Sequence, residues 1–367
     1  MTRHAAGPGD ALLRLFEDQG FERVETPVLQ PAELFFDLSG EDIRRRLFLT
    51  QDNAGAEFCL RPEYTIPVCR QHVASGELVG AYCYLGPVFR QRSEGPAEFH
   101  QVGVESIGRA DISPADADIL SLALDGFALS PRLGGYDVRV GDMGLLSVVF
   151  AELGLAPPVQ RRLIRSLAGG QGADVALEPD SRAAGSDYAG LLAAIEGQDP
   201  KAARAFVEDV ISIAGISRVG GRSAGEIADR FLAKAENRFG TLGDREREVL
   251  RRYLAIAGDL DEAADAIRSL ASDEKLDLAA ALDIFDERTG FIAARGIDLA
   301  RLRFAADFAR TLDYYTGFIF EIRDAGRPEG WYVAAGGRYD RLLQHVGARA
   351  PVPAVGVSFW LDPEPVR

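Results

Sequence analysis

Alternating apolar and polar positions predict strands in the first and the last part of the chain, with helices around them. A strand that buries one face carries an apolar side chain at every second position, whereas a helix repeats its apolar positions every three or four residues. The strands of the first part are expected at 21–29, 47–50, 57–60, 78–84, 86–90, 99–107 and 136–140. Its helices are expected at 11–21 and 114–129, and a further helix is expected to follow residues 61–65 and to run to about residue 75. Pro27 interrupts the first of these strands, and proline suits a sheet edge or a dimer seam.

The pattern becomes helical near residue 157. Ser223 and Glu226 have the spacing of a capping box, and the apolar stripe that follows them ends at Gly240. Further helical stripes run over 249–256 and 276–294. Strand signals return at 302–308, 318–322, 331–335 and 354–361. We therefore expect residues 157–295 to form a helical insertion between two parts of one core, 1–156 and 296–367.

Length and composition are those of a globular protein without membrane segments. The chain has 367 residues, of which 47% are hydrophobic and 26% charged, so a large core can form. No apolar run is long enough for a membrane-spanning helix, and the N-terminus lacks the apolar stretch of a signal peptide. Cys59, Cys69 and Cys83 lack CxxC spacing, so reduced thiols are expected and no metal site. These features predict a cytoplasmic location.

The charge balance argues against a nucleic-acid partner. A protein that binds tRNA neutralises phosphates with Lys and Arg. This chain has 41 Lys and Arg against 56 Asp and Glu, a formal net charge of −15 and a pI of about 4.9. We therefore expect no tRNA partner.

The stretch RTLDYYTGFIFE, which begins at Arg310, carries the first candidate chemistry. Arg310 supplies a fixed cation, and Tyr314 and Tyr315 supply two phenol groups at the entrance of a strand. Together these groups could bind a small zwitterion. The alternative is a tyrosine-rich hairpin in the core, in which Arg310 forms an ion pair with Asp307 or Asp313.

Four parts of the chain resemble the catalytic core of class II aminoacyl-tRNA synthetases, the histidyl-tRNA synthetases in particular. They are GFERVETPVLQPAELF at 20–35 (motif 1), LRPEYT at 60–65 (the family's LRPEGT), FRQRSEGPAEFHQVGVE at 89–105 (motif 2), and RTLDYYTGFIFE with AAGGRYDRLL and PAVGVSFWL (histidine segment and motif 3). The resemblance covers roughly residues 10–150 and 295–362. It implies an α+β fold, a class II synthetase-like antiparallel sheet flanked by helices. It also implies a homodimer whose two-fold axis runs near Pro27.

The same resemblance implies a site for free histidine. Its residues would be Glu63, Thr65, Arg90, Gln101, Glu105, Arg310, Tyr314 and Tyr315. The ammonium would face Glu63, Gln101 and Glu105, with Thr65 beside them. Arg310 would face the carboxylate, and the two tyrosines the imidazole. The alternative is that the two glutamates are solvated surface acids. The position of Glu105 in a strand with alternating apolar residues argues against this alternative.

Other positions depart from the synthetase pattern. Trp360 stands where motif 3 has a small residue, and Pro363 stands where it has the arginine that binds ATP. Arg92 replaces an acidic residue of motif 2. The loop between Arg90 and Phe99 is shorter than in the family, and its GPAE end lacks the basic residues found there. The sequence ends at Arg367, so no anticodon-binding domain is expected.

A retained histidine site without the ATP arginine resembles the ATP phosphoribosyltransferase regulatory subunit family. This resemblance implies a protein that is not an enzyme and uses no cofactor. Its partner would be a short-form catalytic ATP phosphoribosyltransferase, which it activates within a hetero-oligomer. It would contribute histidine feedback in the first step of histidine biosynthesis.

Three alternatives remain at this stage. The chain could be an active histidyl-tRNA synthetase. It could instead be a free-standing enzyme that adenylates another acceptor, with an arginine such as Arg338 replacing the missing one. It could also be a scaffold whose histidine site is a relic.

Overall fold

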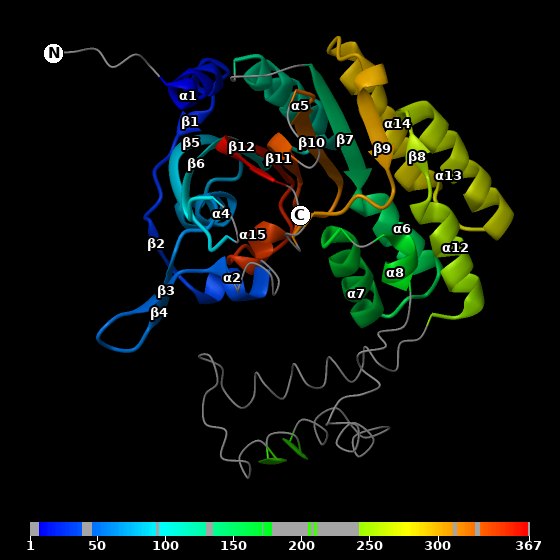
Figure 1. The fold of residues 1–367 in the computed structure, drawn as a ribbon, viewed down its shortest axis with the longest axis horizontal. Coiled ribbons are helices and arrows are strands. Elements are labelled where there is room, and N and C mark those ends of the chain that lie inside the picture. The colour runs from blue at the N-terminus through cyan, green and yellow to red at the C-terminus, as the bar shows by residue number, and fades with distance from the viewer. Residues whose placement is uncertain are drawn as a thin grey trace.

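The computed structural model describes residues 7–38, 46–92, 95–129, 135–170, 172–177, 205–206, 209–210, 242–310, 314–326 and 331–365. A nine-stranded sheet forms the centre of this part of the chain (Figure 1). In spatial order its strands are β1 (Glu22–Arg23), β5 (Gly80–Phe89), β6 (Glu98–Ile107), β12 (Ala354–Pro365), β11 (Trp331–Arg338), β10 (Phe318–Asp324), β7 (Tyr136–Asp142), β9 (Leu302–Ala305) and β8 (Ala257–Gly258). A small second sheet contains β2 (Leu29–Pro31), β4 (Glu57–Leu60) and β3 (Leu49–Gln51).

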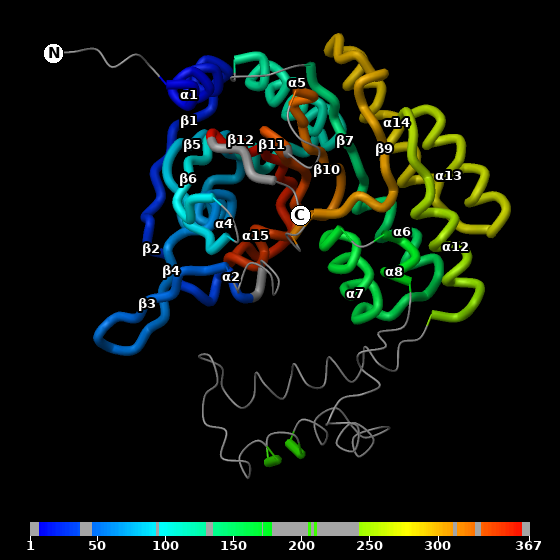
Figure 2. Tube along the Cα trace, viewed as in Figure 1, coloured from blue at the N-terminus to red at the C-terminus, as the bar shows by residue number. Residues whose placement is uncertain are grey.

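The central sheet is antiparallel except at two pairs near its ends, β1 with β5 and β7 with β9. Figure 2 shows by colour that the last strands of the chain lie between β6 and β7. The first and last parts of the sequence therefore build one sheet.

Helices cover both faces of the sheet. Their bounds are α1 (Pro8–Asp18), α2 (Glu33–Leu38), α4 (Thr65–Ser75), α5 (Ile112–Leu129), α6 (Met143–Glu152), α7 (Pro157–Ala168), α8 (Ala173–Leu177), α12 (Asp244–Leu254), α13 (Leu260–Glu274), α14 (Ala279–Ala294) and α15 (Leu342–His345). A short 3-10 turn, η2 (Leu299–Arg301), precedes β9. Among the described helices, none is long and apolar enough to cross a membrane.

The pairing register sorts side chains onto two faces of the sheet. Tyr84, Gly103 and Ser358 lie side by side on β5, β6 and β12. Because successive residues of a strand point to opposite sides, Val102 and Val104 point to the other face. There they join the main core, which α1, α5 and α14 cover. Gln101 and Glu105 consequently lie on the face that carries Tyr84, together with α4 and α15.

The structure corrects the strand predicted at 21–29. Only Glu22–Arg23 and Leu29–Pro31 are strands, and they belong to different sheets. Pro27 lies between them and has no N–H for a strand ladder. The carbonyl of Thr26 is instead bound by the side chain of Arg61.

Two other boundaries also differ. The strands predicted at 78–84 and 86–90 are one strand, β5, which continues through Pro87. Proline is tolerated there because β1 pairs with β5 only at Tyr82 and Cys83, which leaves that edge open at Pro87. The helix predicted at 276–294 begins only at Ala279, because α13 ends at a left-handed Lys275 with φ 57°.

The helices described within 157–295 pack against the core. α14 lies along α5, and α12 and α13 contribute to the same apolar cluster as the sheet. β8 is a short strand inside this range and pairs with β9. The capping box predicted at Ser223 and Glu226 lies outside the described residues. The division of the chain into core and insertion stays a prediction.

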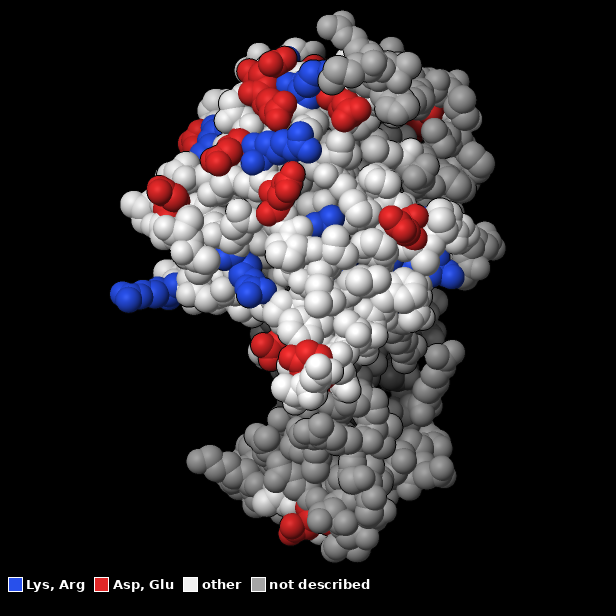
Figure 3. Space-filling view, turned by 90° about the vertical axis from the view of Figure 1, so that its left-hand side faces the viewer, with Lys and Arg blue, Asp and Glu red and all other residues white. Residues whose placement is uncertain are grey.

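The charged side chains are unevenly distributed over the surface. Figure 3 shows the side of the molecule on which β1, β2 and β5 lie. Charged side chains are sparse across the middle of this face, even though the whole chain carries a net charge of −15. Val28 and Leu29, which precede and begin β2, are 38% and 47% exposed.

Candidate functional site

Glu105 is the centre of a group of polar side chains between the sheet and α4. Its side chain is buried, and its carboxylate accepts hydrogen bonds from Thr65 Oγ1 at 2.6 Å, from Tyr84 at 3.2 Å and from the hydroxyl of Tyr339. Burial, assisted by the nearby Glu63, raises the pKa of Glu105 to about 8 although the hydroxyl donors oppose the rise. A pKa raised in this direction favours the protonated form of Glu105. We call Glu63, Thr65, Tyr84, Glu105, Tyr314, Tyr315 and Tyr339 the acid–tyrosine cluster.

Glu63 has a structural task in this cluster. Its carboxylate accepts the backbone N–H groups of Thr65 at 2.7 Å and Ile66 at 2.9 Å, at the first turn of α4. These free N–H groups would otherwise lack partners, and an acidic side chain also suits the positive end of a helix. Burial nevertheless raises the pKa of Glu63. Neither Glu63 nor Glu105 is a solvated surface acid, since both are at most 4% exposed.

Tyr314 and Tyr315 complete the cluster from the segment before β10. Their ring centroids are 5.0 Å apart, and the ring of Tyr314 also meets the ring of Tyr339 edge-on at 5.7 Å. Burial raises the pKa of Tyr314 and of Tyr339, which keeps both hydroxyls protonated as hydrogen-bond donors. The two predicted tyrosines thus reach Glu105 through Tyr339.

Arg310 lies beside the cluster without a close ion pair. Its Nη1 is 3.8 Å from Glu321 Oε2, and its guanidinium carbon is 5.2 Å from the ring centroid of Tyr332. Glu321 has a closer partner in Arg323, whose Nε donates to it at 2.9 Å. Asp307, the partner considered from the sequence, pairs with Arg139 at 3.0 Å instead. Asp313 lies outside the described residues.

Gln101 and Arg90 occupy the rim of the cluster. Gln101 lies on β6 between Gly86 and Trp360 of the neighbouring strands and is 1% exposed. Arg90 Nε donates to the carbonyl of Pro62 at 2.7 Å, which fixes the segment that carries Glu63. The structure therefore brings seven of the eight predicted residues to one region, and it gives Arg90 a supporting position beside them.

Sequence reasoning missed Tyr84, Tyr339 and Gly356. A Cβ atom on Gly356 would lie 1.9 Å from Glu105 Oε2, so only glycine leaves room for this carboxylate. Tyr84 Oη lies 2.6 Å from Ser358 Oγ and thereby links β5 to β12 across Gly103. The Gly-Gly-Arg-Tyr run that ends at Tyr339 was the available signal, but the hydroxyl positions depend on strand pairing.

A buried aromatic cluster lies next to these residues. Tyr64, which replaces the glycine of the LRPEGT pattern, stacks on Tyr84 with ring centroids 4.4 Å apart. The guanidinium carbon of Arg92 is 3.6 Å from the ring centroid of Phe99. Trp360 is 5% exposed and belongs to the same cluster. Aromatic side chains and Arg92 therefore fill the space next to the motif 2 and motif 3 strands.

Comparison with known proteins identifies the family. The family model of histidyl-tRNA synthetase matches residues 3–214 and 206–363. ATP phosphoribosyltransferase regulatory subunits from Brucella canis and Brucella ovis are 41% identical over 347 residues, which is 93% of this chain and 92% of theirs. The chain belongs to the ATP phosphoribosyltransferase regulatory subunit family.

Solved structures agree on the fold of this family member. An ATP phosphoribosyltransferase regulatory subunit/histidyl-tRNA synthetase from Bacillus halodurans matches 97% of the chain and 76% of its own, with a TM-score of 0.65 and 20% identity. A histidyl-tRNA synthetase from Nostoc matches 98% and 74%, with a TM-score of 0.63 and 16% identity. The predicted class II synthetase-like fold is confirmed.

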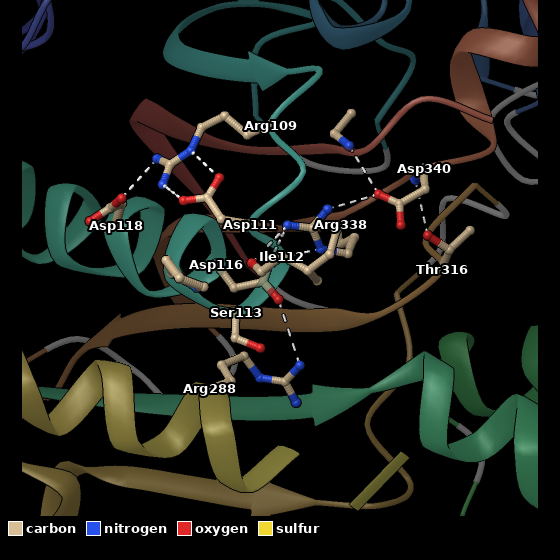
Figure 4. Close-up of polar contacts among 12 residues, drawn as sticks. Arg109, Asp111, Ile112, Ser113, Asp116, Asp118, Arg288, Thr316, Arg338 and Asp340 are labelled. Carbon is tan, nitrogen blue, oxygen red and sulfur yellow. Dashed lines mark hydrogen bonds and ion pairs between the residues drawn. The ribbon is translucent and has the colours of Figure 1, made fainter. Parts of the chain in front are cut away.

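A second set of buried charges joins the helices of this regulatory-subunit family member to its sheet (Figure 4). Arg338 on β11 donates to Asp116 of α5 at 2.8 Å and to Asp340 at 2.9 Å. Arg288 of α14 pairs with Asp142 and lies 3.6 Å from Asp116. Arg338 is thus held by two carboxylates of its own chain and is not available as a substitute for the missing ATP arginine.

This charge network ends beside the acid–tyrosine cluster. The backbone N–H of Asp340 donates to Thr316 Oγ1 at 3.0 Å, and Thr316 follows Tyr315 directly. The carboxylate of Asp340 also accepts the N–H of Ala354 at 2.9 Å. Tyr339, which donates to Glu105, lies between the two charged residues. The network therefore fixes the backbone that carries the cluster's tyrosines.

Two further features lie outside the acid–tyrosine cluster and form no comparable site. A cavity of about 390 Å³ lies between the end of α1 and the middle of α5. Its arginines, Arg109 and Arg295, both pair with Asp118, at 2.7 and 2.5 Å. Among the residues described, no group of His, Cys, Asp and Glu side chains could hold a metal ion. The acid–tyrosine cluster with its neighbours remains the candidate site.

Proposed function

We propose that this chain is the regulatory subunit of an ATP phosphoribosyltransferase and performs no chemistry of its own. Relatives that are 41% identical over 93% of the chain carry this name, which supports the regulatory role. The partner is a catalytic ATP phosphoribosyltransferase, of the short form that requires a regulatory subunit. The buried aromatic side chains around Trp360, where a synthetase binds its nucleotide, are consistent with a subunit that makes no adenylate.

The ligand of the candidate site is free histidine. The observation that carries this proposal is the convergence of Glu63, Gln101, Glu105, Arg310 and the tyrosine pair on one face of the sheet. A carboxylate and an amide oxygen suit an ammonium group, and a guanidinium suits a carboxylate. The tyrosine hydroxyls can hydrogen-bond the ring nitrogens of an imidazole.

Histidine acts on the complex through linkage. A ligand that binds two assembly states unequally shifts the population toward the state it binds more tightly. The Asp340–Thr316 contact connects the cluster to α5 and α14. The two assembly states can therefore differ in the positions of these helices as well as in the site. The chain functions as a homodimer within the hetero-oligomer, and tRNA is not a partner.

The test is to mix this chain with a short ATP phosphoribosyltransferase and to measure the rate of phosphoribosyl transfer. We expect the two chains to co-purify and the rate to rise. We further expect histidine to lower the rate of the complex. Equal rates with and without this chain would refute the regulatory role. Histidine-dependent exchange of pyrophosphate into ATP would support an active synthetase instead.

A further inference from the structure

Gln101, Arg310 and Trp360 each carry a buried polar atom without a partner. Gln101 Oε1, Arg310 Nε and Trp360 Nε1 have no hydrogen bond to any residue that the structure describes. A buried polar atom without a partner destabilises the folded chain, so such atoms are normally satisfied by protein, water or a ligand. The acceptor on Gln101 and the donors on Arg310 and Trp360 could all be satisfied by one bound molecule.

The three side chains follow one another across the sheet. Gln101 on β6 and Trp360 on β12 are directly paired, so their side chains share a face. The ring of Trp360 meets the ring of Tyr332 edge-on at 4.8 Å between centroids. The guanidinium carbon of Arg310 lies 5.2 Å from the centroid of the same tyrosine. Tyr332 thus joins the two donors, and strand pairing places the acceptor next to them.

We propose that Trp360 is a specificity residue of the candidate site, whose indole N–H donates a hydrogen bond to the carboxylate of a free α-amino acid. Arg310 Nε donates to the same carboxylate, and Gln101 Oε1 accepts from the ammonium group. A zwitterionic amino acid carries two acceptor oxygens and three donor hydrogens in one small molecule, which matches the open atoms. The inference rests on the proposed function, because histidine is the amino acid that the neighbouring tyrosines would select.

This role explains why a large residue stands at position 360. An ester or an acyl adenylate of histidine has no carboxylate charge, so the indole N–H loses its charged acceptor. The group attached to the carboxyl carbon would also have to displace the packed rings of Trp360 and Tyr332. The site would therefore bind the free amino acid and reject its activated forms, which suits a sensor of the free pool.

The experiment compares histidine with histidinol, in which a hydroxymethyl group replaces the carboxylate. Calorimetric titrations use the full chain, its Trp360→Phe variant and, as a matched control, its Trp331→Phe variant. We expect Trp360→Phe to lower the affinity for histidine by about tenfold, the value of a hydrogen bond to a charged group. Its affinity for histidinol should equal that of the wild type. Trp331→Phe should leave both affinities unchanged.

A second measurement does not depend on the folding of Trp360→Phe. The chain has 2 tryptophans, so Trp331→Phe leaves Trp360 as the only tryptophan, whose emission can be excited selectively over that of the tyrosines. We expect saturating histidine to shift its emission, because the indole N–H gains a charged partner, and histidinol at saturation to shift it less. Identical emission with and without bound histidine would overturn the inference.

The outcomes separate this inference from the proposed function. If the wild type binds histidine and Trp360→Phe binds it equally well, Trp360 is not in the site, and the histidine sensor stands. If Trp360→Phe weakens histidine and histidinol by the same factor, the indole contributes packing only, and the carboxylate contact is wrong. If the wild type binds no histidine, the sensor proposal fails, and this inference fails with it.

Discussion

At the residue scale, we expect the protonation of Glu105 to influence ligand binding at the candidate site. Its carboxyl group is surrounded by hydroxyl groups of Thr65, Tyr84 and Tyr339 and lies near Glu63 and Cys69. In the free protein its pKa is raised to about 8, chiefly by burial. An ammonium group beside it would favour the carboxylate, so binding would release a proton.

This leads to a pH prediction for Glu105→Gln. In the wild type, histidine affinity should rise as the pH goes from about 6 to about 8 and should then level off. The reason is that a smaller fraction of Glu105 is protonated at higher pH, so fewer molecules must lose that proton when histidine binds. The imidazole of histidine titrates with a pKa of about 6.5 in both proteins, so the difference between them isolates Glu105. Calorimetry in buffers of different ionisation enthalpy should detect more proton release from the wild type than from Glu105→Gln. Equal proton release from both proteins would contradict the assignment.

The raised pKa of Glu105 also makes the free energy of unfolding depend on pH. Unfolded glutamate ionises near pH 4.3, whereas folded Glu105 ionises near 8, so the folded state binds more protons between these values. The stabilising contribution of Glu105 is complete below the unfolded pKa and is lost as the pH rises through the folded pKa. The free energy of unfolding of the unliganded wild type should therefore fall relative to Glu105→Gln between pH 5 and 8, as measured by denaturant titration.

Arg310→Met tests the other end of the ligand. Methionine retains much of the apolar stem but removes the donors that would meet the ligand's carboxylate. Truncating one member of a buried charged pair costs about 2–5 kcal/mol, so histidine affinity should fall by roughly thirtyfold or more. Calorimetric titration measures the affinity, with circular dichroism as the check on folding.

Arg323→Met is the matched control for this prediction. Arg323 binds the opposite oxygen of Glu321 and has no proposed ligand contact. Its replacement should leave histidine affinity near the wild-type value. An unchanged affinity in Arg310→Met would mean that the carboxylate of the ligand binds elsewhere, and the proposal of a histidine sensor at this site would fail.

At the scale of elements, the buried network of Arg288, Asp116 and Arg338 joins α14 and α5 to β11. Asp142 adds α6, because its Oδ1 accepts the N–H of Leu145 and caps that helix. Helices α5, α6 and α14 therefore meet strands β7 and β11 at two buried arginines, each at most 5% exposed along its side chain. Such a network orients helices on a sheet more sharply than apolar contacts alone, because each guanidinium needs its carboxylates in fixed positions.

Removing Arg288 should destabilise this arrangement strongly. Arg288→Met leaves Asp142 without its buried cation and reduces the positive charge beside Asp116. Breaking a buried ion pair in this way costs about 3–5 kcal/mol. Thermal and urea unfolding should both report the loss. Arg268→Met is the control, since Arg268 pairs with Asp265 and Asp286 at the surface and should cost less than about 1 kcal/mol.

At the scale of the whole molecule, the prediction concerns the face that carries β1 and β2. Charged side chains are sparse across its middle (Figure 3). Val28 and Leu29, which follow Pro27 in the sequence, are exposed. Apolar exposure of this kind suits an interface between copies of the chain. We expect a homodimer of twice 39.7 kDa by light scattering coupled to gel filtration.

A charge at this face should break the dimer. Leu29→Glu would place a carboxylate in the apolar seam and should yield monomers. Ile284→Glu is the matched control, because Ile284 and Leu29 are both 47% exposed, and Ile284 lies on α14 at the opposite side of the molecule (Figure 1). A dimer that persists in Leu29→Glu would place the two-fold axis elsewhere.

The sequence by itself determined the class of fold and most of the candidate site. Period-two alternation predicted the strand around Glu105, and the resemblance of the motifs at Glu63 and Arg310 to those of histidyl-tRNA synthetases predicted the α+β class and the residues of the candidate site. The departures at Trp360 and Pro363 were also readable, because each is a change of residue type at a position that a motif defines.

Only the tertiary structure decided which atoms are satisfied and which are open. Tyr339 reaches Glu105 because β11 pairs with β12 and β12 with β6, which brings together residues more than 230 positions apart. The same pairing sets Trp360 opposite Gln101 and leaves both polar atoms without a partner in the described structure. Strand register and helix packing, which are long-range properties, fix such contacts. A local pattern predicts that a side chain is buried, but not which group it meets there.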